Sequence, residues 1–327
     1  MPAIQKGPRR WRLVLAALLC VPIAMTVWLR EPRPLHYEGE LSLLELPVEP
    51  GGLPGGMRVE KLWHLEAKRS DFGGYSAILH LPDGRFMLYA DKGDALEFAL
   101  PGDTRAGPAR FLTIPRDQRY LREFQDIESA TRDPETGDIW LGYESMNILR
   151  RFDPEGNPAG LVVPRPMSRW PANTGAEAFV RLADGRFLVM NESTGDALLW
   201  EQDPRSGQEP MQFRYAAPRG MSVTDAAQLP DGRVLVLLRT LTVGLPPFRA
   251  GLALADPDAI SADSPWRLEW LADLTGPLPR ENYEGLDVSE AEDGSLRLWL
   301  VSDDNMAALQ RTLLAEIRWD EWRVLPR

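Results

Sequence analysis

Residues 180–192 read VRLADGRFLVMNE, two strand-like runs that flank an Asp-Gly pair. Asp-Gly between alternating apolar residues is the strongest short-range signal for a β-hairpin, because both central residues of the favoured two-residue turn need positive φ. The stretch therefore predicts a hairpin that turns at Gly185.

The same pattern recurs four more times along the chain, and its period indicates the fold. The other copies are LHLPDGRFMLYAD (79–91), TRDPETGDIWLGYE (131–144), AQLPDGRVLVLLR (227–239) and SEAEDGSLRLWLVSDD (289–304). The turn glycines, Gly84, Gly137, Gly185, Gly232 and Gly294, are 53, 48, 47 and 62 residues apart. A period of about 50 residues that holds four strands is the size of one β-propeller blade. We therefore predict an all-β propeller of five blades, or of six if residues 35–48 and 239–281 contain extra strands.

Strands from both ends of the chain are predicted to complete the last blade. Two more strand-like stretches follow the hairpins, as at residues 197–200 and 211–215, which brings each repeat to four strands. The last repeat is followed by one clear strand at residues 311–319, and residues 59–65 are expected to supply the missing one. A β-sandwich or a β-helix would not explain a four-strand period this regular.

The first thirty residues differ in composition from the rest. Lys6, Arg9, Arg10 and Arg12 precede an apolar run at residues 13–29, which predicts a hydrophobic helix that targets or anchors the chain. A small-x-small cleavage site is missing, which favours an uncleaved signal anchor, whereas the short length of the run favours a cleaved signal peptide. In either case we expect the bulk of the chain on the periplasmic or extracellular side, anchored to the cytoplasmic membrane or secreted after cleavage.

The chain is accordingly divided into three regions. Residues 1–30 are predicted to be a signal-anchor or transmembrane segment, residues 31–56 a linker rich in Pro, Gly and Glu, and residues 57–327 the propeller domain. The net charge is −11, and it falls to −16 without the five basic residues of the first segment. Such a domain is not expected to bind nucleic acid, whereas metal cations and basic partners suit it. The sequence does not indicate an oligomeric state.

Charged residues recur at fixed offsets from the turn glycines. After the turns come Asp91, Glu144, Glu192, Arg239 and Asp303, seven residues past the first four glycines and nine past Gly294. Seven to ten residues before the turns come Ser76, Glu128, Glu177, Asp225 and Glu284. Counting outward from the turns places Glu177 directly opposite Glu192, and Glu128 within one residue of facing Glu144.

These charged strand ends predict a metal site in the central funnel. Like charges that face each other destabilise a ladder, so a cation, a shared proton or a nearby Arg is needed. The charged ends lie opposite the turns, so closure of the ring would collect them at one mouth of the funnel. The predicted metal ligands are Asp91, Glu128, Glu144, Glu177, Glu192, Asp225, Glu284 and Asp303.

Calcium is the metal that this oxygen-rich set favours. Carboxylates together with Asn173, Asn191, Asn282 and Asn305 are the ligand types of a hard cation. Three basic residues, Lys92, Arg239 and Arg280, lie near the same positions and could neutralise the ring or hold an anion. The alternative is that the acids are ordinary solvated strand ends.

Other catalytic patterns are absent from the sequence. It has no GxSxG elbow, no phosphate-cradling loop and no dinucleotide fingerprint. The three histidines, His36, His64 and His80, are not spaced as metal ligands, and His64 and His80 are expected on strand faces.

At the charged strand ends the sequence resembles the phytase-like family of bacterial secreted propellers, also called esterase-like activity of phytase. The matching stretches are FGGYSAI (72–78) with YADKGD (89–94), DIESA (126–130) with GYES (142–145), NTGAEAF (173–179) with VMNES (189–193), VTDAAQLPDGRVLVLLR (223–239), and ENYEGLDV (281–288) with LVSDDN (300–305) and Gln310. The sequence departs from the family where Lys92 stands for an Arg and where Leu238 stands for an acid. The resemblance implies a propeller with phosphoester or carboxylester hydrolase activity.

Two functional hypotheses follow. The first is an exported, metal-assisted hydrolase of a phosphoester or another anionic small-molecule ester. Its catalytic residues would be Glu177, Glu192 and Arg239, and its substrate-binding residues Lys92, Arg239, Asn282 and Asn305. The second is a non-catalytic propeller at the cell envelope that captures a ligand or a partner in the same funnel.

Overall fold

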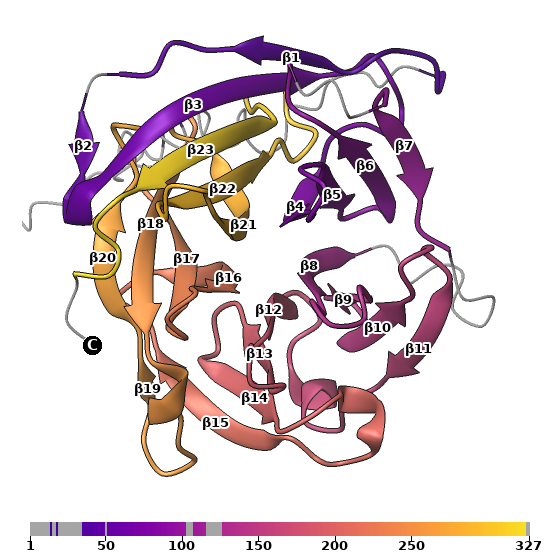
Figure 1. Ribbon diagram of the computed structural model, residues 1–327, viewed down its shortest axis with the longest axis vertical. Helices are drawn as coiled ribbons and strands as arrows, with labels where there is room; N and C mark the ends of the chain where they lie inside the picture. The colour runs from indigo at the N-terminus through magenta and orange to yellow at the C-terminus, as the bar shows by residue number, and fades with distance from the viewer. Residues whose placement is uncertain are drawn as a thin grey trace, which may run out of the picture.

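The protein forms a ring of five blades around a central axis (Figure 1). The structure is a computed structural model, and it describes residues 14, 18, 35–49, 51–102, 107–115 and 126–324. Strands make up nearly all of its regular structure. Between residues 35 and 324, the described helices are single 3₁₀ turns at Pro54–Gly56, Met167–Arg169, Pro204–Ser206 and Pro257–Ala259, and residues 14 and 18 are helical.

Each blade is an antiparallel sheet whose four main strands follow one another from the axis outward. Blade one is β4 (Tyr75–His80), β5 (Phe86–Ala90), β6 (Asp94–Phe98) and β7 (Arg110–Thr113). Blade two is β8 (Ile127–Arg132), β9 (Ile139–Tyr143), β10 (Ile148–Phe152) and β11 (Pro158–Val162). Blade three is β12 (Ala176–Arg181), β13 (Phe187–Asn191), β14 (Asp196–Trp200) and β15 (Met211–Ala216). Blade four is β16 (Ser222–Gln228), β17 (Val234–Leu241), β18 (Phe248–Ala255) and β20 (Glu269–Asp273).

Blade five joins the two ends of the described chain. It contains β21 (Asn282–Glu290), β22 (Leu296–Asp303), β23 (Leu313–Trp319) and β3 (Met57–Glu66). The early strand β3 pairs with the last strand β23 from His64 opposite Leu313 to Met57 opposite Trp319, and the two lie side by side in Figure 1. The predicted closure by residues 59–65 is therefore confirmed.

The predicted five-blade count is also confirmed, and the two segments that could have held a sixth blade extend existing ones. Residues 239–281 contribute β18, β20 and β19 (Trp266–Arg267), and β19 pairs in parallel with β15 at the edge of blade three. The region predicted to be a linker contributes β1 (Ser42–Glu45) and β2 (Gly52–Leu53), and both pair with β3. The predicted N-terminal hydrophobic helix lies outside the described residues, apart from residues 14 and 18. In the part of the chain that the structure describes, no helix is long and apolar enough to cross a bilayer.

Five predicted turns join the inner two strands of the blades. The turn glycines Gly84, Gly137, Gly185, Gly232 and Gly294 have φ between 77° and 102°. An L side chain rarely adopts such values, so glycine is needed at these positions. The residue before each glycine does not have positive φ, and the backbone hydrogen bond from Leu182 N to Arg186 O encloses three loop residues. The reversals are therefore where the pattern predicts them, but they are longer than the expected two-residue turn.

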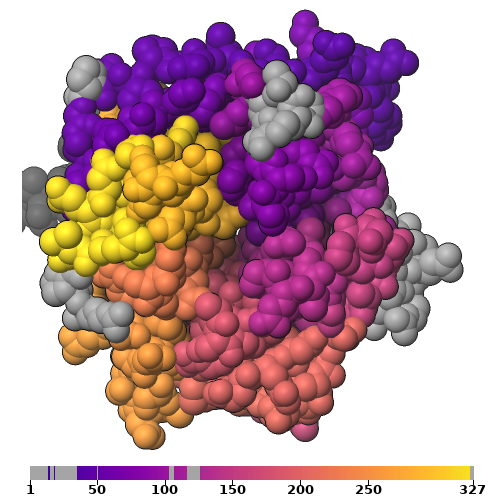
Figure 2. Space-filling view, viewed as in Figure 1, coloured from indigo at the N-terminus to yellow at the C-terminus, as the bar shows by residue number. Residues whose placement is uncertain are grey.

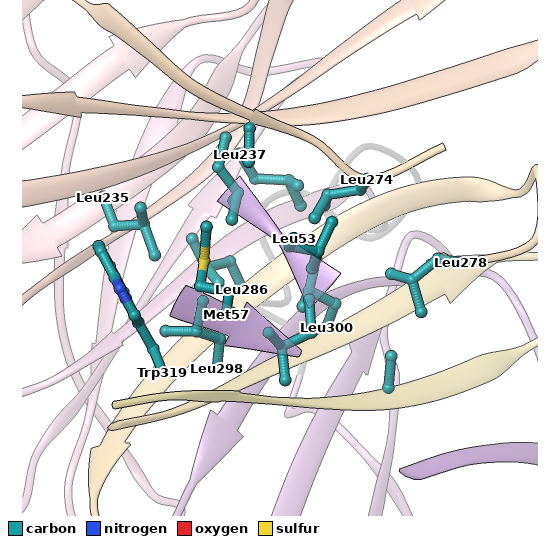
Figure 3. Close-up of a cluster of buried hydrophobic side chains, with 14 of the residues drawn as sticks. Leu53, Met57, Leu235, Leu237, Leu274, Leu278, Leu286, Leu298, Leu300 and Trp319 are labelled. Carbon is teal, nitrogen blue, oxygen red and sulfur yellow. The ribbon is translucent and has the colours of Figure 1, made fainter. Parts of the chain in front are cut away.

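The hydrophobic core lies between neighbouring blades. In Figure 3, Leu235 and Leu237 of β17 lie on one side of the cluster and Leu298 and Leu300 of β22 on the other, with Leu286 of β21 between them and Trp319 at the edge. Each of these side chains is fully buried. Each blade has a neighbouring blade on both faces, which explains why its strands are apolar runs in the sequence. The same packing holds the inner strands against one another around the axis: β4, β8, β12, β16 and β21.

Candidate functional site

A β-bulge near the start of every inner strand takes one residue out of the ladder, and in four of the five blades the side chain of that residue lines the central cavity. In β12, Ala176 pairs with Asn191 and Ala178 pairs with Met190, so Glu177 is the extra residue. The equivalent residues of the five blades are Ser76, Glu128, Glu177, Thr224 and Glu284. Bulges re-aim side chains in this way, and here the sequence repeats the device in all five blades.

The bulge corrects the predicted pairing of the acids. Glu177 does not face Glu192 across the ladder, because the bulge removes Glu177 from the register and Glu192 lies one residue beyond β13. Glu128 is likewise the extra residue in β8, while Glu144 pairs through its backbone N–H with the carbonyl of Asp126. Counting from the turn assumed a regular ladder, so the predicted register was one residue wrong at the site.

The charged strand ends nevertheless meet in one cavity of about 270 Å³. Its lining consists of Ser76, Asp91, Asp126, Glu128, Glu144, Asn173, Glu177, Glu192, Arg239, Glu284, Asp303 and Asn305. Figure 2 shows the five blades closing around the centre of the ring. We call the side of the ring on which β5, β9, β13, β17 and β22 end the funnel face, and the side with the five turns the turn face. Eight carboxylates and one guanidinium thus share a small space.

Three of these carboxylates form a candidate metal site. Asp126, Glu128 and Glu144 each place one carboxylate oxygen within 4.8 Å of the other two. Ser145 donates a hydrogen bond to Asp126 and holds it from the outer side. All three side chains are only partly exposed, and oxygens converging at such distances fit the ligand type of Ca²⁺ or Mg²⁺.

Burial and mutual repulsion raise the pKa values of the clustered acids. The pKa of Glu128 is held well above its usual range, first by burial and then by Glu177, Glu284, Asp126 and Glu144. The pKa of Glu177 is raised well above normal by burial and by its carboxylate neighbours, against the attraction of Arg239. Such shifts mean that the positive charge in the cavity is too small to balance its carboxylates when all of them are ionised.

Two further groups show the same effect. Burial and the nearby Asp126 raise the pKa of Glu144 to about 7. Burial, opposed by Lys92, raises the pKa of Asp91 to about 6, and the buried Oδ1 atom of Asp91 has no hydrogen-bond partner. An orphaned carboxylate oxygen beside a cluster of acids is the environment that a cation would satisfy.

Arg239 neutralises one side of the ring. Its Nη2 donates to Glu192 at 2.9 Å, and its Nη1 donates to Glu284 and to Asn282. The guanidinium therefore joins the ends of blades three, four and five. Its donors are directed at residues of this chain, so it acts as an internal counter-ion in the structure.

Three predicted residues lie outside the cavity lining. Asp225 follows the bulge of β16, and its carboxylate accepts hydrogen bonds from the backbone of Ala226 and from Leu286 of the next blade. Lys92 donates to the carbonyl of Phe72 at 2.9 Å. Asn282 lies behind Arg239 and donates to Glu284. The structure brings the other predicted site residues together.

Asp126 is the site residue that the sequence reasoning missed. It stands two positions before Glu128, and residues two apart on a strand share a face. The spacing of two residues between Asp126 and Glu128 could therefore have indicated Asp126 as a site residue. The repeat in the sequence marks only one position per strand end, and the other blades have Gly74, Gly175, Ser222 and Asn282 where blade two has Asp126.

The chain was compared with known proteins. No curated protein matches. Among solved structures, it is similar to a luciferin-regenerating enzyme (12% identity, covering 86% of this chain and 95% of that one, TM-score 0.44). It is similar to an endo-arabinase of Bacteroides thetaiotaomicron (10% identity, covering 82% of this chain and 97% of that one, TM-score 0.49). It is also similar to the PQQ domain of a pyranose dehydrogenase of Coprinopsis cinerea (10% identity, covering 87% of this chain and 98% of that one, TM-score 0.46).

A family model covers most of the ring. The model for the phytase-like family, described as esterase-like activity of phytase, matches residues 70–306. The matched range begins just before β4 and ends just after β22, and so includes every residue that lines the acidic cavity. This protein therefore belongs to the phytase-like family of β-propellers.

Proposed function

We propose that this protein is an exported hydrolase that uses a divalent metal, with calcium favoured, to cleave a phosphoester or a related anionic ester. The observation that carries the proposal is the convergence of Asp126, Glu128 and Glu144 inside a cavity lined by eight carboxylates. Membership of the phytase-like family supports the hydrolase class. The nearest guanidinium, that of Arg239, donates instead to Glu192, Glu284 and Asn282.

The cation explains how an anion could enter an acidic cavity. A divalent ion held by Asp126, Glu128 and Glu144 would supply Lewis acidity to the ester oxygens and offset their repulsion from the cavity wall. Asn305 lies in the same lining and could donate a hydrogen bond to the substrate. Arg239 keeps Glu192 and Glu284 in place by hydrogen bonding to both.

Two side chains are assigned to proton transfer. Glu177, whose pKa is raised by burial and by neighbouring carboxylates, is the group assigned to give a proton to the leaving alkoxide. Glu192, held by Arg239, accepts a proton from the attacking water. Water then adds its oxygen to phosphorus, the bond from phosphorus to the ester oxygen breaks, and the products are an alcohol and inorganic phosphate. Proton exchange with solvent restores both glutamates.

One observation favours a second candidate, a propeller that binds a ligand through a metal without cleaving it. Arg239, predicted to hold a substrate anion, donates to three residues of this chain. A guanidinium used in this way stabilises the site without contacting substrate. In this case the same cavity would capture a ligand at the cell envelope.

A turnover assay separates the two candidates. We expect phosphate or carboxylic ester hydrolysis by the purified protein to require added calcium, and Glu128→Gln to reduce it by at least about a hundredfold, in the range that loss of an essential charge stabiliser produces. Glu201→Gln, which alters an exposed acid outside the cavity, is the matched control. Stoichiometric calcium binding without turnover of any ester would reject the hydrolase and support the binding propeller.

A further inference from the structure

We propose that the funnel face docks on a lipid bilayer, so that the substrate is a phosphoester presented by a lipid headgroup. This inference rests on the proposed hydrolase function for its substrate and on described surface residues for its docking. The exposed apolar side chains of the funnel face, the hairpin that carries three of them, the place where the chain enters the ring and the charges at the rim support it.

The first feature is the distribution of exposed apolar side chains. Between residues 35 and 324, ten large hydrophobic side chains of the described chain are exposed. Seven of them belong to strand ends and loops of the funnel face: Leu35, Tyr37, Val163, Leu241, Val243, Leu245 and Leu309. An apolar surface gathered on one face is typical of a protein or membrane contact, whereas scattered residues are ordinary.

The second feature is a projecting hairpin that carries three of these residues. Strands β17 and β18 remain paired beyond Arg239, through Thr240 opposite Arg249 and Leu241 opposite Phe248. A hydrogen bond from Thr242 N to the carbonyl of Pro247 closes the tip. Leu241, Val243 and Leu245 are exposed by 66%, 94% and 59%. The tip therefore presents aliphatic groups on an ordered support beside the cavity.

The third feature is the place where the chain enters the ring. Ser42 at the start of β1 pairs with Glu66 at the funnel-face end of β3, and the carbonyl of His36 accepts from Ser70 in the connection to blade one. Only residues 30–34 separate the apolar run at residues 13–29 from Leu35. Five to six extended residues reach about 20 Å. A bilayer holding that run would consequently lie on the funnel side.

Charged residues at the rim suit an anionic bilayer. Exposed basic side chains occupy three connections between blades on this face: Lys68, Arg165, Arg169 and Arg219. Each Lys or Arg near an anionic surface contributes about 1 kcal/mol of attraction. Three exposed acids of this face, Glu38, Glu40 and Glu66, lie by the outer strands β1 and β3, away from the axis. The basic rim and the aliphatic hairpin would thus surround the acidic cavity.

The docking is tested by quenching of a fluorophore in the full-length protein. Cys20, the single cysteine, is first replaced by serine. A fluorophore is then attached to Val243→Cys or, as the turn-face control, to Glu201→Cys, and the protein is reconstituted in vesicles of equal parts phosphatidylglycerol and phosphatidylcholine. We expect brominated lipid to quench the probe at 243 and not the probe at 201. Equal quenching at both positions, or none at 243, would overturn the proposal whether or not the protein is a hydrolase.

The substrate is tested by offering one phosphomonoester in two forms. Phosphatidic acid in the vesicles would yield diacylglycerol and phosphate, and soluble glycerol 3-phosphate would yield glycerol and phosphate. We expect Val243→Asp to lower the first rate about tenfold, as loss of one buried aliphatic contact predicts, and to leave the second unchanged. Equal loss of both rates, or hydrolysis of the soluble ester alone by the wild type, would contradict a lipid substrate. Absence of both reactions would count against the hydrolase and leave the quenching result to decide docking.

Discussion

At the scale of single residues, the cavity is governed by the cost of burying carboxylates close together. Glu177 is buried and Glu128 is partly buried, and Glu177 raises the pKa of Glu128. Glu192, Glu144 and Glu284 in turn raise the pKa of Glu177. A folded protein tolerates such a cluster when protons or cations enter it. Stability should therefore respond to pH and to metal through the same few groups.

The stability of the metal-free protein should rise as pH falls from about 8 to about 5.5. The folded pKa values of Glu144 and Asp91, about 7 and about 6, lie above those of unfolded chains, so the folded state holds more protons in this window. The free energy of unfolding consequently decreases as pH rises through the window. Urea denaturation in a chelator at several pH values measures it. A free energy that instead increases with pH across this window would show that the raised pKa values are wrong.

Glu128→Gln should stabilise the metal-free protein, because it removes an acid whose charged form is disfavoured by burial and by four neighbouring carboxylates, without removing volume. The gain should shrink as pH falls, since the wild type then loses its negative charge at this position. Calcium at a hundred times its Kd should add about 2.7 kcal/mol to the free energy of unfolding of the wild type and of Glu201→Gln, and so raise the Tm of both. It should hardly change the Tm of Glu128→Gln. If chelation leaves the wild type unchanged while Glu128→Gln melts much lower, internal hydrogen bonds hold the acids and the metal site is wrong.

The sequence predicted most of the site residues, but not how they are arranged. Fixed offsets from the turn glycines located Glu144, Glu192 and Asp303, because the strand that leaves each turn is regular. The strand that enters the turn carries the bulge, which no local pattern marks. For the same reason Asp225 was predicted as a ligand, although the bulged residue of its strand is Thr224.

At the scale of elements, hydrogen bonds between blades supplement the apolar packing. Asp225 accepts from Leu286 N of blade five at 2.7 Å, and Asp287 accepts from His80 N of blade one at 2.6 Å. Between blades two and three hydroxyls make the contacts, since Ser129 donates to the carbonyl of Ala176 and Thr131 accepts from Arg181 N. Polar side chains on the inner strands thus fix neighbouring blades to one another.

Asp225→Ala should lower the free energy of unfolding by about 1–3 kcal/mol, because it leaves the buried N–H groups of Ala226 and Leu286 without an acceptor. Equilibrium urea denaturation measures the change. Asp258→Ala, an exposed acid bonded to Arg186, is the matched control and should change stability by less than about 0.5 kcal/mol. An unchanged midpoint for Asp225→Ala would show that the contact between blades four and five contributes nothing.

The elements themselves followed from the sequence where turns are tight and strands are apolar. All five inner hairpins and their glycines were predicted, because a turn glycine between two apolar runs, preceded by Asp in four copies and by Thr136 in the second, marks the reversal locally. The edge strand β19 was not, since its two residues are held by a parallel pairing with β15, about fifty residues earlier in the chain. Pairings of that separation depend on tertiary contacts that local patterns do not contain.

At the scale of the whole molecule, the ring depends on one noncovalent junction. The backbone ladder between β3 and β23 joins the early part of the chain to its end, and the core of blade five contains residues from both. Around the rest of the ring, consecutive blades are linked through the chain itself. Loss of one strand from blade five should therefore open the ring and destabilise all five blades.

Removal of β3 should abolish folding, whereas removal of the segment before it should be tolerated. A chain that begins at residue 67 exposes the edge of β23 and loses Leu62, Trp63 and Leu65 from the core, so we expect insoluble protein. A chain that begins at residue 51 keeps β2 and β3, loses only partly buried contacts such as Leu46, and should melt cooperatively at a lower Tm. Circular dichroism and gel filtration compare the two chains. A soluble, cooperatively melting chain from residue 67 would refute the role of the junction.

The meeting of the chain ends in blade five also means that the point at which the ring is cut is arbitrary. Gly56 lies against the side chain of Glu321, so a short peptide could connect the two ends and the chain could be opened elsewhere. A circular permutant opened at the turn of Asp184 and Gly185 would keep the same ring but begin on the turn face. Attached to a membrane through that new end, the permutant would present the acidic cavity to the solvent, so the side of the ring that faces an anchoring surface would follow from where the ring is opened.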